Sequence, residues 1–481
     1  MRITAIADAP GAPPSLGAAD HRAYREMLGC LSTETGPVLR ASSFLGSGEP
    51  GGGGYAGHAE IYDLDGLLRD TYRQPSMEPG VNDTLFGGGK GFGLVPTMLS
   101  TVGEAVERAV AGLVGCSPHL PGPRTMGSWQ ELTARGLTAL DPERVGLFSE
   151  AQYAAPHFLY ARFTRDTTVQ WVQGRRLVSG EPTWVPAQLV DMVHIYDPAE
   201  EIVGYPVSGG LSCHTSTAAA TYHGLTEVIE RDAVNVSWYT PEPPRRVRVD
   251  GDVRAVLGRF ADRMRLDHSA SYLLLHPSGV CTAPTFSVVG FQEWLRRRQY
   301  CAGGGCDVEP RTALRKAAAE FGQTRSTLGT SIAAPRSAVG RSVQTMFDWS
   351  VGRPLAEMTL FFQAIGYYGL DEYAGLLDHY LSGPEVDLAD VLADAPVTDP
   401  GAGVERRLAA LLEQLGGHGI DPVVLDYSHP QWRQLAVVKV YVPELTTPFL
   451  QSRPMLGHPR LATLRGSVRA ADGTILPLPY P

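Results

Sequence analysis

One segment of this 481-residue chain, Gly210–Val234, has the sequence GLSCHTSTAAATYHGLTEVIERDAV and limits the possible folds more than any other. Its second half is rich in alanine and predicts a helix. Glu227 and Glu230 stand three residues apart, so both carboxylates project from one helix face, with Arg231 next to them. Two like charges held together cost free energy unless a cation joins them, so the pair suggests a metal site. For one Glu-x-x-Glu motif alone, a solvated helix face is the alternative.

A similar pattern occurs in residues 87–110, GGGKGFGLVPTMLSTVGEAVERAV. We expect its glycine-rich start to form a loop that carries a lysine into a helix. It is not a Walker loop, because glycine follows the lysine where serine or threonine is required. The residues that share one face of this segment, or lie beside it, are Lys90, Ser100, Glu104, Glu107 and Arg108.

The pattern recurs in residues 303–325, GGGCDVEPRTALRKAAAEFGQTR. We expect a glycine turn followed by a helix with Pro310 near its start. Glu320 and Gln323 stand three residues apart on this helix, and Arg325 is close by. Three separate helices therefore present carboxylate or amide side chains at the same spacing.

The remaining segments predict an α+β protein with mixed or antiparallel sheets packed against helices. Alternating apolar and polar residues over 145–206 indicate antiparallel strands. Residues 271–277, 283–291 and 435–445 are also typical of strands, whereas residues 21–31, 61–72 and 404–415 indicate helices. Residues 46–54, GSGEPGGGG, predict a flexible loop.

Composition limits the class of protein. A net charge of -10 argues against a nucleic-acid-binding surface and gives no support for binding an anionic membrane. The six cysteines form no Cys-x-x-Cys pair, which fits a reducing cytoplasm without structural zinc or disulfides. The N-terminus lacks the pattern of a signal peptide, and we expect no transmembrane segment.

Taken together, these motifs resemble the YcaO family from about Gly87 to the C-terminus. The resemblance rests on GGGKGFG with its SxxxExxER helix, on LTEVIERDA, on the third helix with its ExxQ motif, and on VKVYVPEL. The closing Pro-x-Pro-x-Pro is similar to the tail of azoline-forming cyclodehydratases. The resemblance to the family implies a catalytic domain over residues 81–460 and a tail over residues 461–481 that enters the active site. It assigns no role to residues 1–80.

The resemblance implies a cytoplasmic enzyme that uses ATP and Mg²⁺ to convert Cys, Ser or Thr of a precursor peptide into a thiazoline or oxazoline. A side chain adds to the preceding carbonyl, the amide oxygen is phosphorylated, and phosphate leaves. The implied metal ligands are Glu104, Glu107, Glu227, Glu230 and Glu320. The implied nucleotide contacts are Lys90, Ser100, Arg108, His214, Thr215, Arg231, Gln323 and Arg325. The implied catalytic tail residues are Pro477, Pro479 and Pro481, with the terminal carboxylate pointing into the active site.

The resemblance also implies partners: a precursor peptide, a leader-binding protein of the E1-like or ocin-ThiF type, and a second copy in a homodimer. The chain departs from the family pattern where Gly209, Thr215 and Ala219 replace Asn, Asn and Glu. His214 and Thr215 are candidates to replace these contacts, with a structural role for His214 as the alternative. Cys306 stands where relatives often carry His. A non-catalytic scaffold with this fold and a thioamide-forming YcaO protein therefore stay open as alternatives.

Overall fold

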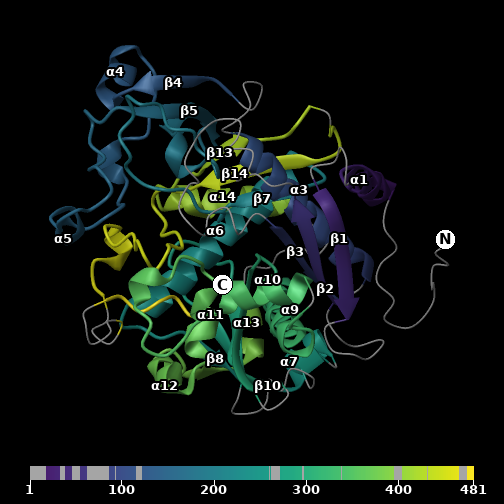
Figure 1. Ribbon diagram of the computed structural model, residues 1–481. Coiled ribbons are helices and arrows are strands. Elements are labelled where there is room, and N and C mark those ends of the chain that lie inside the picture. Colours follow the sequence, from purple (N-terminus) through teal and green to yellow (C-terminus); the bar gives the residue numbers. More distant parts are fainter. Residues whose placement is uncertain are drawn as a thin grey trace.

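The structure is a computed structural model that describes residues 18–32, 38–45, 55–61, 86–92, 94–114, 122–258, 260–261, 271–294, 297–336, 338–394, 403–430, 432–464, 468 and 474–480 (Figure 1). The expected loop over 46–54 and Pro481 lie outside these ranges. So does the expected helix over 61–72, apart from Ile61, which ends a strand. An α+β architecture is confirmed, with three sheets and helices packed against them.

The first sheet is antiparallel, in the order β1-β2-β3. Its strands are β1 (Val38–Leu45), β2 (Tyr55–Ile61) and β3 (Phe86–Gly91). Helix α3 (Leu94–Val114) covers it, and α1 (Ala18–Gly29) packs against α3. Strands β1 and β2 come from the N-terminal region without an assigned role, so that region helps to build the sheet that carries Lys90.

The second sheet has the order β11-β10-β9-β8-β12 and is antiparallel except for the parallel β8–β12 pair. Its strands are β8 (Arg245–Val247), β9 (Ser271–His276), β10 (Thr285–Trp294), β11 (Arg297–Cys306) and β12 (Glu385–Val386). Helix α9 (Pro310–Ala333) packs along β11 and β10, and α10 (Ala338–Phe347) packs against α9. The smaller helices nearby are α7 (Gly251–Leu257), α11 (Gln363–Tyr368), α12 (Asp371–Ala374) and α13 (Leu388–Asp394).

The third sheet has the order β4-β5-β13-β14-β7, with β6 paired to β5, and all its pairs are antiparallel. Its strands are β4 (Arg124–Gly127), β5 (Val169–Arg176), β6 (Pro182–Pro186), β7 (Leu211–His214), β13 (Val423–Asp426) and β14 (Ala436–Tyr441). The short helices α4 (Trp129–Ala134) and α5 (Glu150–Tyr153) adjoin this part of the fold. The antiparallel strands expected over 145–206 are thus confirmed for its central part only.

Both glycine runs, expected to be a loop and a turn, form strands instead, and those two expectations are wrong. A Cβ on Gly87 of β3 would lie 2.5 Å from the backbone nitrogen of Ala105 in α3. A Cβ on Gly303 of β11 would overlap the backbone of Phe321 in α9. The glycines therefore let α3 and α9 lie directly on their strands, and this close packing fixes where the acidic faces of both helices point.

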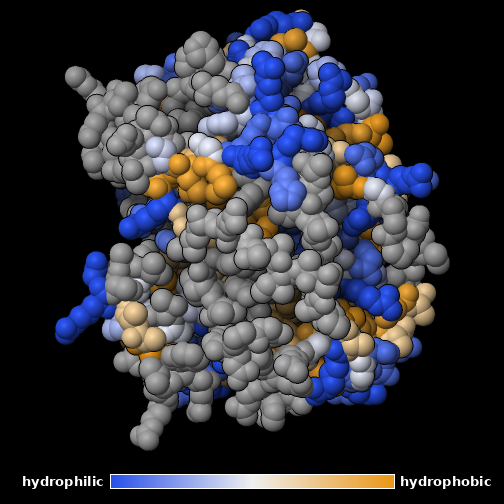
Figure 2. Space-filling model, turned by 90° about the vertical axis from the view of Figure 1, so that its right-hand side faces the viewer, coloured by the Kyte–Doolittle hydropathy of each residue, from blue (hydrophilic) through white to orange (hydrophobic). Residues whose placement is uncertain are grey.

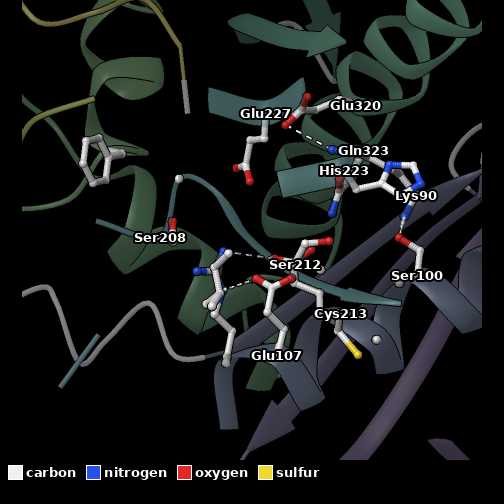
Figure 3. A pocket seen from close by; sticks show the side chains of 18 of the residues that line it. Lys90, Ser100, Glu107, Ser208, Ser212, Cys213, His223, Glu227, Glu320 and Gln323 are labelled. Atoms are coloured by element: carbon white, nitrogen blue, oxygen red, sulfur yellow. Dashed lines mark hydrogen bonds and ion pairs between the residues drawn. The ribbon is translucent and has the colours of Figure 1, made fainter. Parts of the chain in front are cut away.

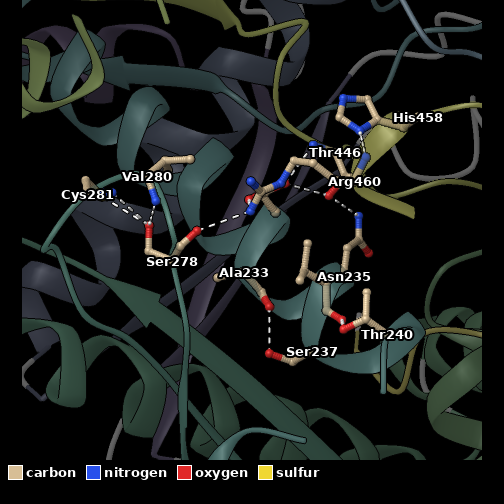
Figure 4. Close-up of polar contacts among 12 residues, drawn as sticks. Ala233, Asn235, Ser237, Thr240, Ser278, Val280, Cys281, Thr446, His458 and Arg460 are labelled. Atoms are coloured by element: carbon tan, nitrogen blue, oxygen red, sulfur yellow. Dashed lines mark hydrogen bonds and ion pairs between the residues drawn. The ribbon is translucent and has the colours of Figure 1, made fainter. Parts of the chain in front are cut away.

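Helix α6 (Thr217–Tyr239) lies in the middle of the fold, between the second and third sheets (Figure 1). Ser216 caps its start by accepting a hydrogen bond from Ala219 N at 3.2 Å. The buried side chains Leu225 and Ile229 belong to the core cluster of α14 (Val404–Gly417) and β14. Arg460 anchors the helix from one side through buried Asp232, at 2.9 and 2.7 Å, and also reaches Ser278 O (Figure 4).

The surface carries scattered apolar side chains. Over the described residues, Figure 2 shows separate hydrophobic groups among hydrophilic ones on the face that it presents. The large apolar residues that are exposed lie far apart in the sequence, and they are Leu28, Leu159, Val178, Ile202 and Val351. Among the helices of the described ranges, none has the length and apolarity needed to cross a membrane.

Candidate active site

A cavity of about 680 Å³ opens where α3, α6 and α9 approach one another beside β3 and β7 (Figure 3). Most of the residues expected from the sequence to form the site line it. They are Lys90, Ser100, Glu104, Glu107, Arg108, His214, Thr215, Glu227, Arg231, Glu320 and Gln323. The fold thus brings three polar helix faces that are far apart in the chain to one place.

Lys90 connects the glycine strand to the third helix. Its Nζ lies 3.2 Å from Glu320 Oε1, and its backbone nitrogen lies 3.5 Å from Ser100 Oγ. Glu320 Oε2 accepts a second hydrogen bond, from Gly304 N at 2.9 Å. Burial alone would raise the pKa of Glu320, but Lys90 and Arg231 outweigh it and lower the pKa. Glu320 is therefore held as a carboxylate.

Arg231 lies among three carboxylates from two helices. Its guanidinium is 4.0 Å from Glu227, 3.9 Å from Glu230 and 3.9 Å from Glu320. Burial raises the pKa of Glu230 to about 7, although Arg231 opposes the shift. Arg231 and Lys90 are thus the two cations beside these three acids, so the acids outnumber the cations in this part of the site.

Arg108 has the corresponding place on α3. Its guanidinium is 3.8 Å from Glu104 and 3.8 Å from Glu107. Arg108 Nε is buried and has no hydrogen-bond partner. Burial raises the pKa of Glu104 and raises that of Glu107 well above its usual value, because the neighbouring Arg108 offsets only part of the desolvation. An unpaired guanidinium nitrogen at a cavity wall fits an anionic ligand.

The turn before β7 is held by a buried lysine. Lys439 Nζ donates to the carbonyls of Val207 and Gly209, both at 2.6 Å. Burial lowers the pKa of Lys439 to about 8. Gly210 has a φ of +84°, and a Cβ there would overlap Val440 O, so only glycine fits. Gly210 N donates to Glu227 Oε2 at 3.2 Å, which connects the turn to the acidic helix face.

Two histidines stack at the end of β7. The rings of His214 and His223 have centroids 5.0 Å apart and an interplanar angle of 14°. Thr215 N donates to His214 Nδ1 at 2.8 Å. Burial lowers the pKa of His223 well below its usual value, so this ring is neutral near pH 7. His223 lies one helical turn from both Ala219 and Glu227, on the same face of α6.

The acids are kept apart by the cations among them. Within the ranges that the structure describes, no three His, Cys, Asp or Glu side chains lie close enough to hold a metal ion alone. Oxygen atoms of a bound phosphate would therefore be needed to complete the ligand shell of Mg²⁺. With Lys90, Arg108 and Arg231 added, the donor set fits a magnesium–polyphosphate ligand rather than a bare ion.

Another wall of the same cavity is apolar. Its residues come from α10, from the segment after it and from the segment that follows β14. They are Val343, Met346, Phe347, Phe361, Phe362, Pro448 and Leu450. The cavity therefore offers both a charged wall and a hydrophobic wall to its ligands.

Four of the expected site residues that the structure describes lie outside the lining of this cavity: Glu230, Arg325, Pro477 and Pro479. Glu230 is buried behind Arg231. Arg325 donates to Gln292 Oε1 on β10 at 3.1 Å, so its side chain faces the second sheet. In the tail, the carbonyls of Pro477 and Pro479 accept hydrogen bonds from Tyr368 and Tyr300, at 2.6 and 2.9 Å. The tail is thus docked into the protein.

Several residues that shape the site are not among those expected from the sequence. His223 could have been found, because it stands four residues before Glu227 on the same helix face. Lys439 lies in a strand that was noted, but nothing in its spacing shows which carbonyls it meets. Tyr480 stands between two prolines in the tail and shows no pattern that indicates a site residue, yet the Arg231 guanidinium lies 5.0 Å from the centroid of its ring.

Comparison with known proteins agrees with this site. A family model described as "YcaO cyclodehydratase, ATP- and Mg²⁺-binding" matches residues 88–446. A protein described as "Uncharacterized protein in tfuA 3'region" from Rhizobium leguminosarum bv. trifolii is 26% identical over 393 residues, which is 79% of this chain and 81% of that protein.

Solved structures share the fold. A heterocyclase in complex with substrate and cofactor superposes with a TM-score of 0.66 at 20% identity, over 92% of this chain but only 54% of that longer one. YcaO from Methanopyrus kandleri, bound with AMPPCP and Mg²⁺, gives 0.54 at 18% identity, over 85% and 86% of the two chains. The E. coli microcin synthetase McbBCD complex with pro-MccB17 gives 0.55 at 13% identity, over 94% and 99%. ATP and Mg²⁺ are the cofactors of the matched family, and this chain belongs to the YcaO family.

Proposed function

We propose that the protein is an ATP-dependent cyclodehydratase that forms azoline rings from Cys, Ser or Thr in a ribosomally made peptide. The observation that carries this proposal is the convergence of α3, α6 and α9 on one cavity whose carboxylates are spaced by three cations. Acidic pairs that were only solvated helix faces would not be expected to converge on one cavity. Membership of a family described as cyclodehydratases adds support.

The charged wall would hold the nucleotide. Glu104, Glu107, Glu227 and Glu320 supply oxygen ligands for Mg²⁺, and Glu230 supports them through Arg231. Lys90, Arg108 and Arg231 offer positive charge to phosphate oxygens, and the unpaired Arg108 Nε supplies a free donor. Bound ATP supplies the phosphoryl group, and the role of these residues is to position it and neutralise its charge.

The apolar wall would receive the peptide. The reaction brings a backbone amide to the nucleotide in the same cavity, so both ligands must share the space. Phe347, Phe361 and Phe362 can exclude water from the reacting amide, which strengthens the electrostatic interactions there. The side-chain thiol or hydroxyl adds to the preceding carbonyl carbon, and the carbonyl oxygen departs as phosphate. The amide nitrogen loses its proton, and so does the thiol or hydroxyl group. Together with the departure of phosphate, these losses leave a C=N bond in the ring.

The family pattern has Asn and Glu at the positions of Thr215 and Ala219. In this chain the stacked rings of His214 and His223 would take over the contacts of those side chains. The stacked imidazoles offer a flat face to the nucleotide, and burial keeps the His223 ring uncharged by lowering its pKa. These rings keep polar groups at this wall of the cavity, and for that reason we favour the enzyme over the non-catalytic scaffold. A leader-binding partner protein is also proposed, in line with the McbBCD complex, which was solved with pro-MccB17 bound.

The test uses a precursor peptide and partner protein encoded beside this chain, with ATP, Mg²⁺ and the full-length protein. Mass spectrometry should show loss of one water for each ring formed. Glu104→Gln and Glu230→Gln should abolish this loss, whereas Glu405→Gln on the exposed face of α14 should not. Exchange of one oxygen for sulfur would identify a thioamide-forming enzyme instead. An unchanged peptide, with a partner shown to bind its leader, would contradict cyclodehydration.

A further inference from the structure

The C-terminal tail is fastened to the core by tyrosine hydroxyls. Tyr239 Oη donates to Leu476 O at 3.3 Å, Tyr368 Oη to Pro477 O at 2.6 Å, and Tyr300 Oη to Pro479 O at 2.9 Å. All three tyrosines are buried, and they come from α6, α11 and β11. The tail path is therefore set by donors on three separate elements, up to the residue before Tyr480.

This path places the ring of Tyr480 against the nucleotide site. Tyr480 is only 1% exposed, and the Arg231 guanidinium lies 5.0 Å from its ring centroid. Arg231 lines the cavity whereas Tyr480 does not, so the ring supports Arg231 from behind. The Tyr480 hydroxyl has no hydrogen-bond partner and abuts Gly304, where a Cβ would overlap it.

The Tyr480 ring constrains Arg231 in a way that the three acids do not. The contacts of Arg231 with Glu227, Glu230 and Glu320 are 3.9 to 4.0 Å long, beyond hydrogen-bond distance, so these three acids attract the guanidinium without defining its plane. A flat aromatic face beneath a guanidinium restricts it to one plane and adds cation–π attraction. The ring of Tyr480 can therefore position Arg231. The hydroxyl of Tyr480 has no hydrogen-bond partner and so does not hold Arg231.

We propose that Tyr480 is a positioning residue of the nucleotide site, and that its ring holds Arg231 in the orientation that meets the phosphates of Mg²⁺-bound ATP. The inference rests on the proposed function. It changes the expected role of the tail: beyond a part in cyclisation, the tail contributes to nucleotide binding. Removing its last two residues should therefore weaken binding of ATP as well as turnover.

The experiment titrates the full chain with a non-hydrolysable ATP analogue and Mg²⁺ in a calorimeter. Tyr480→Leu should raise Kd roughly three- to tenfold, as expected for losing a desolvated cation–π contact. Tyr480→Phe keeps the ring and should bind like the wild type. Tyr153→Leu is the matched control, because Arg162 lies 4.4 Å from the Tyr153 ring at a site away from the cavity.

A double-mutant cycle with Arg231→Gln separates positioning from general loosening. In that background, Tyr480→Leu should cause no further loss of affinity, because the residue it positions is absent. Equal Kd values for Tyr480→Leu and Tyr153→Leu would overturn the inference, as would equal losses for Tyr480→Leu and Tyr480→Phe, or additive losses in the cycle. A wild-type protein that does not bind the analogue would instead refute the proposed function, and the inference with it. Melting temperatures of the free variants show whether each one is folded.

Discussion

Lys90 Nζ lies 3.2 Å from Glu320 Oε1, and this ion pair joins the first sheet to helix α9 across the cavity. Both residues line the cavity. Burial lowers the pKa of Lys90, but Glu320, Glu104 and Glu230 outweigh it and raise the pKa above its usual value. The lysine is therefore a fixed positive charge beside Glu320.

Replacing Lys90 by Met should both destabilise the protein and weaken nucleotide binding. Breaking a fully buried pair costs about 3–5 kcal/mol, and partial exposure of Lys90 reduces this to about 1–3 kcal/mol. Chemical denaturation measures the stability, and calorimetry measures binding of the Mg²⁺–ATP analogue. Lys90→Met combined with Glu320→Gln should recover stability but not binding. Recovery of binding in the double variant would contradict a phosphate role for Lys90.

Stability without nucleotide or Mg²⁺ should fall as pH rises, in part because of Glu230. The pKa of this carboxyl is raised from 4.5 to about 7 in the folded protein by burial. Between these values the folded state binds more protons than the unfolded state, so stability is full below about pH 4.5 and is lost as pH rises through about 7. Glu230→Gln removes this contribution.

Melting temperatures from about pH 5 to about pH 8 test the sign of this effect. The wild type should lose stability relative to Glu230→Gln across that range, whereas Glu405→Gln should follow the wild type. The opposite result is that the wild type gains stability relative to Glu230→Gln as pH rises. It would show that the fold favours the ionised form of Glu230, which contradicts the raised pKa.

Gly210→Ala should be strongly destabilising. The residue needs a positive φ of +84°, and an added Cβ would overlap Val440 O. Gly180 has a φ of +74° with open space around its Cα, so Gly180→Ala measures the cost of the backbone angle alone, about 1–2 kcal/mol. Gly210→Ala should lose at least about 2 kcal/mol more in urea denaturation. Equal losses would mean that the turn can move away from β14.

Lys439→Met should disturb the turn over 207–210 and with it the nucleotide site. The change leaves the carbonyls of Val207 and Gly209 without their donor, at a cost of about 1–3 kcal/mol for each. Because this turn lines the cavity and binds Glu227, nucleotide affinity should fall together with stability. Lys316→Met is the control, since Lys316 pairs with buried Asp307 at 2.8 Å outside the cavity lining. It should lose stability and keep its affinity.

Much of the site follows from the sequence because helical spacing fixes which side chains share a face. Glu104 with Glu107, and Glu320 with Gln323, line the cavity as that spacing predicts. Spacing does not show how a helix is rotated against its sheet, so Arg325 was expected in the site although it faces β10. For the same reason Glu230 is behind Arg231 rather than at the cavity wall.

The glycine runs show a second limit. A series of glycines carries neither the β-branched residues nor the alternation that indicates a strand, so both runs were expected to be loop or turn. Their strand conformation depends on the helices packed on them, which is a tertiary effect. The stacking of His214 on His223 and the contact of Tyr480 with Arg231 are also long-range, and no local pattern predicts them.

On the proposed function, α3, α6 and α9 together form one Mg²⁺-dependent nucleotide site. The most direct measurement is calorimetric titration of the wild type and Glu107→Gln with a non-hydrolysable ATP analogue, with and without Mg²⁺. Burial raises the pKa of Glu107, so glutamine mimics the protonated side chain and the variant should stay folded. We expect the wild type to bind only with Mg²⁺, and Glu107→Gln to bind at least about tenfold more weakly. Binding that is equal in both proteins, or that is independent of Mg²⁺, would contradict the claim.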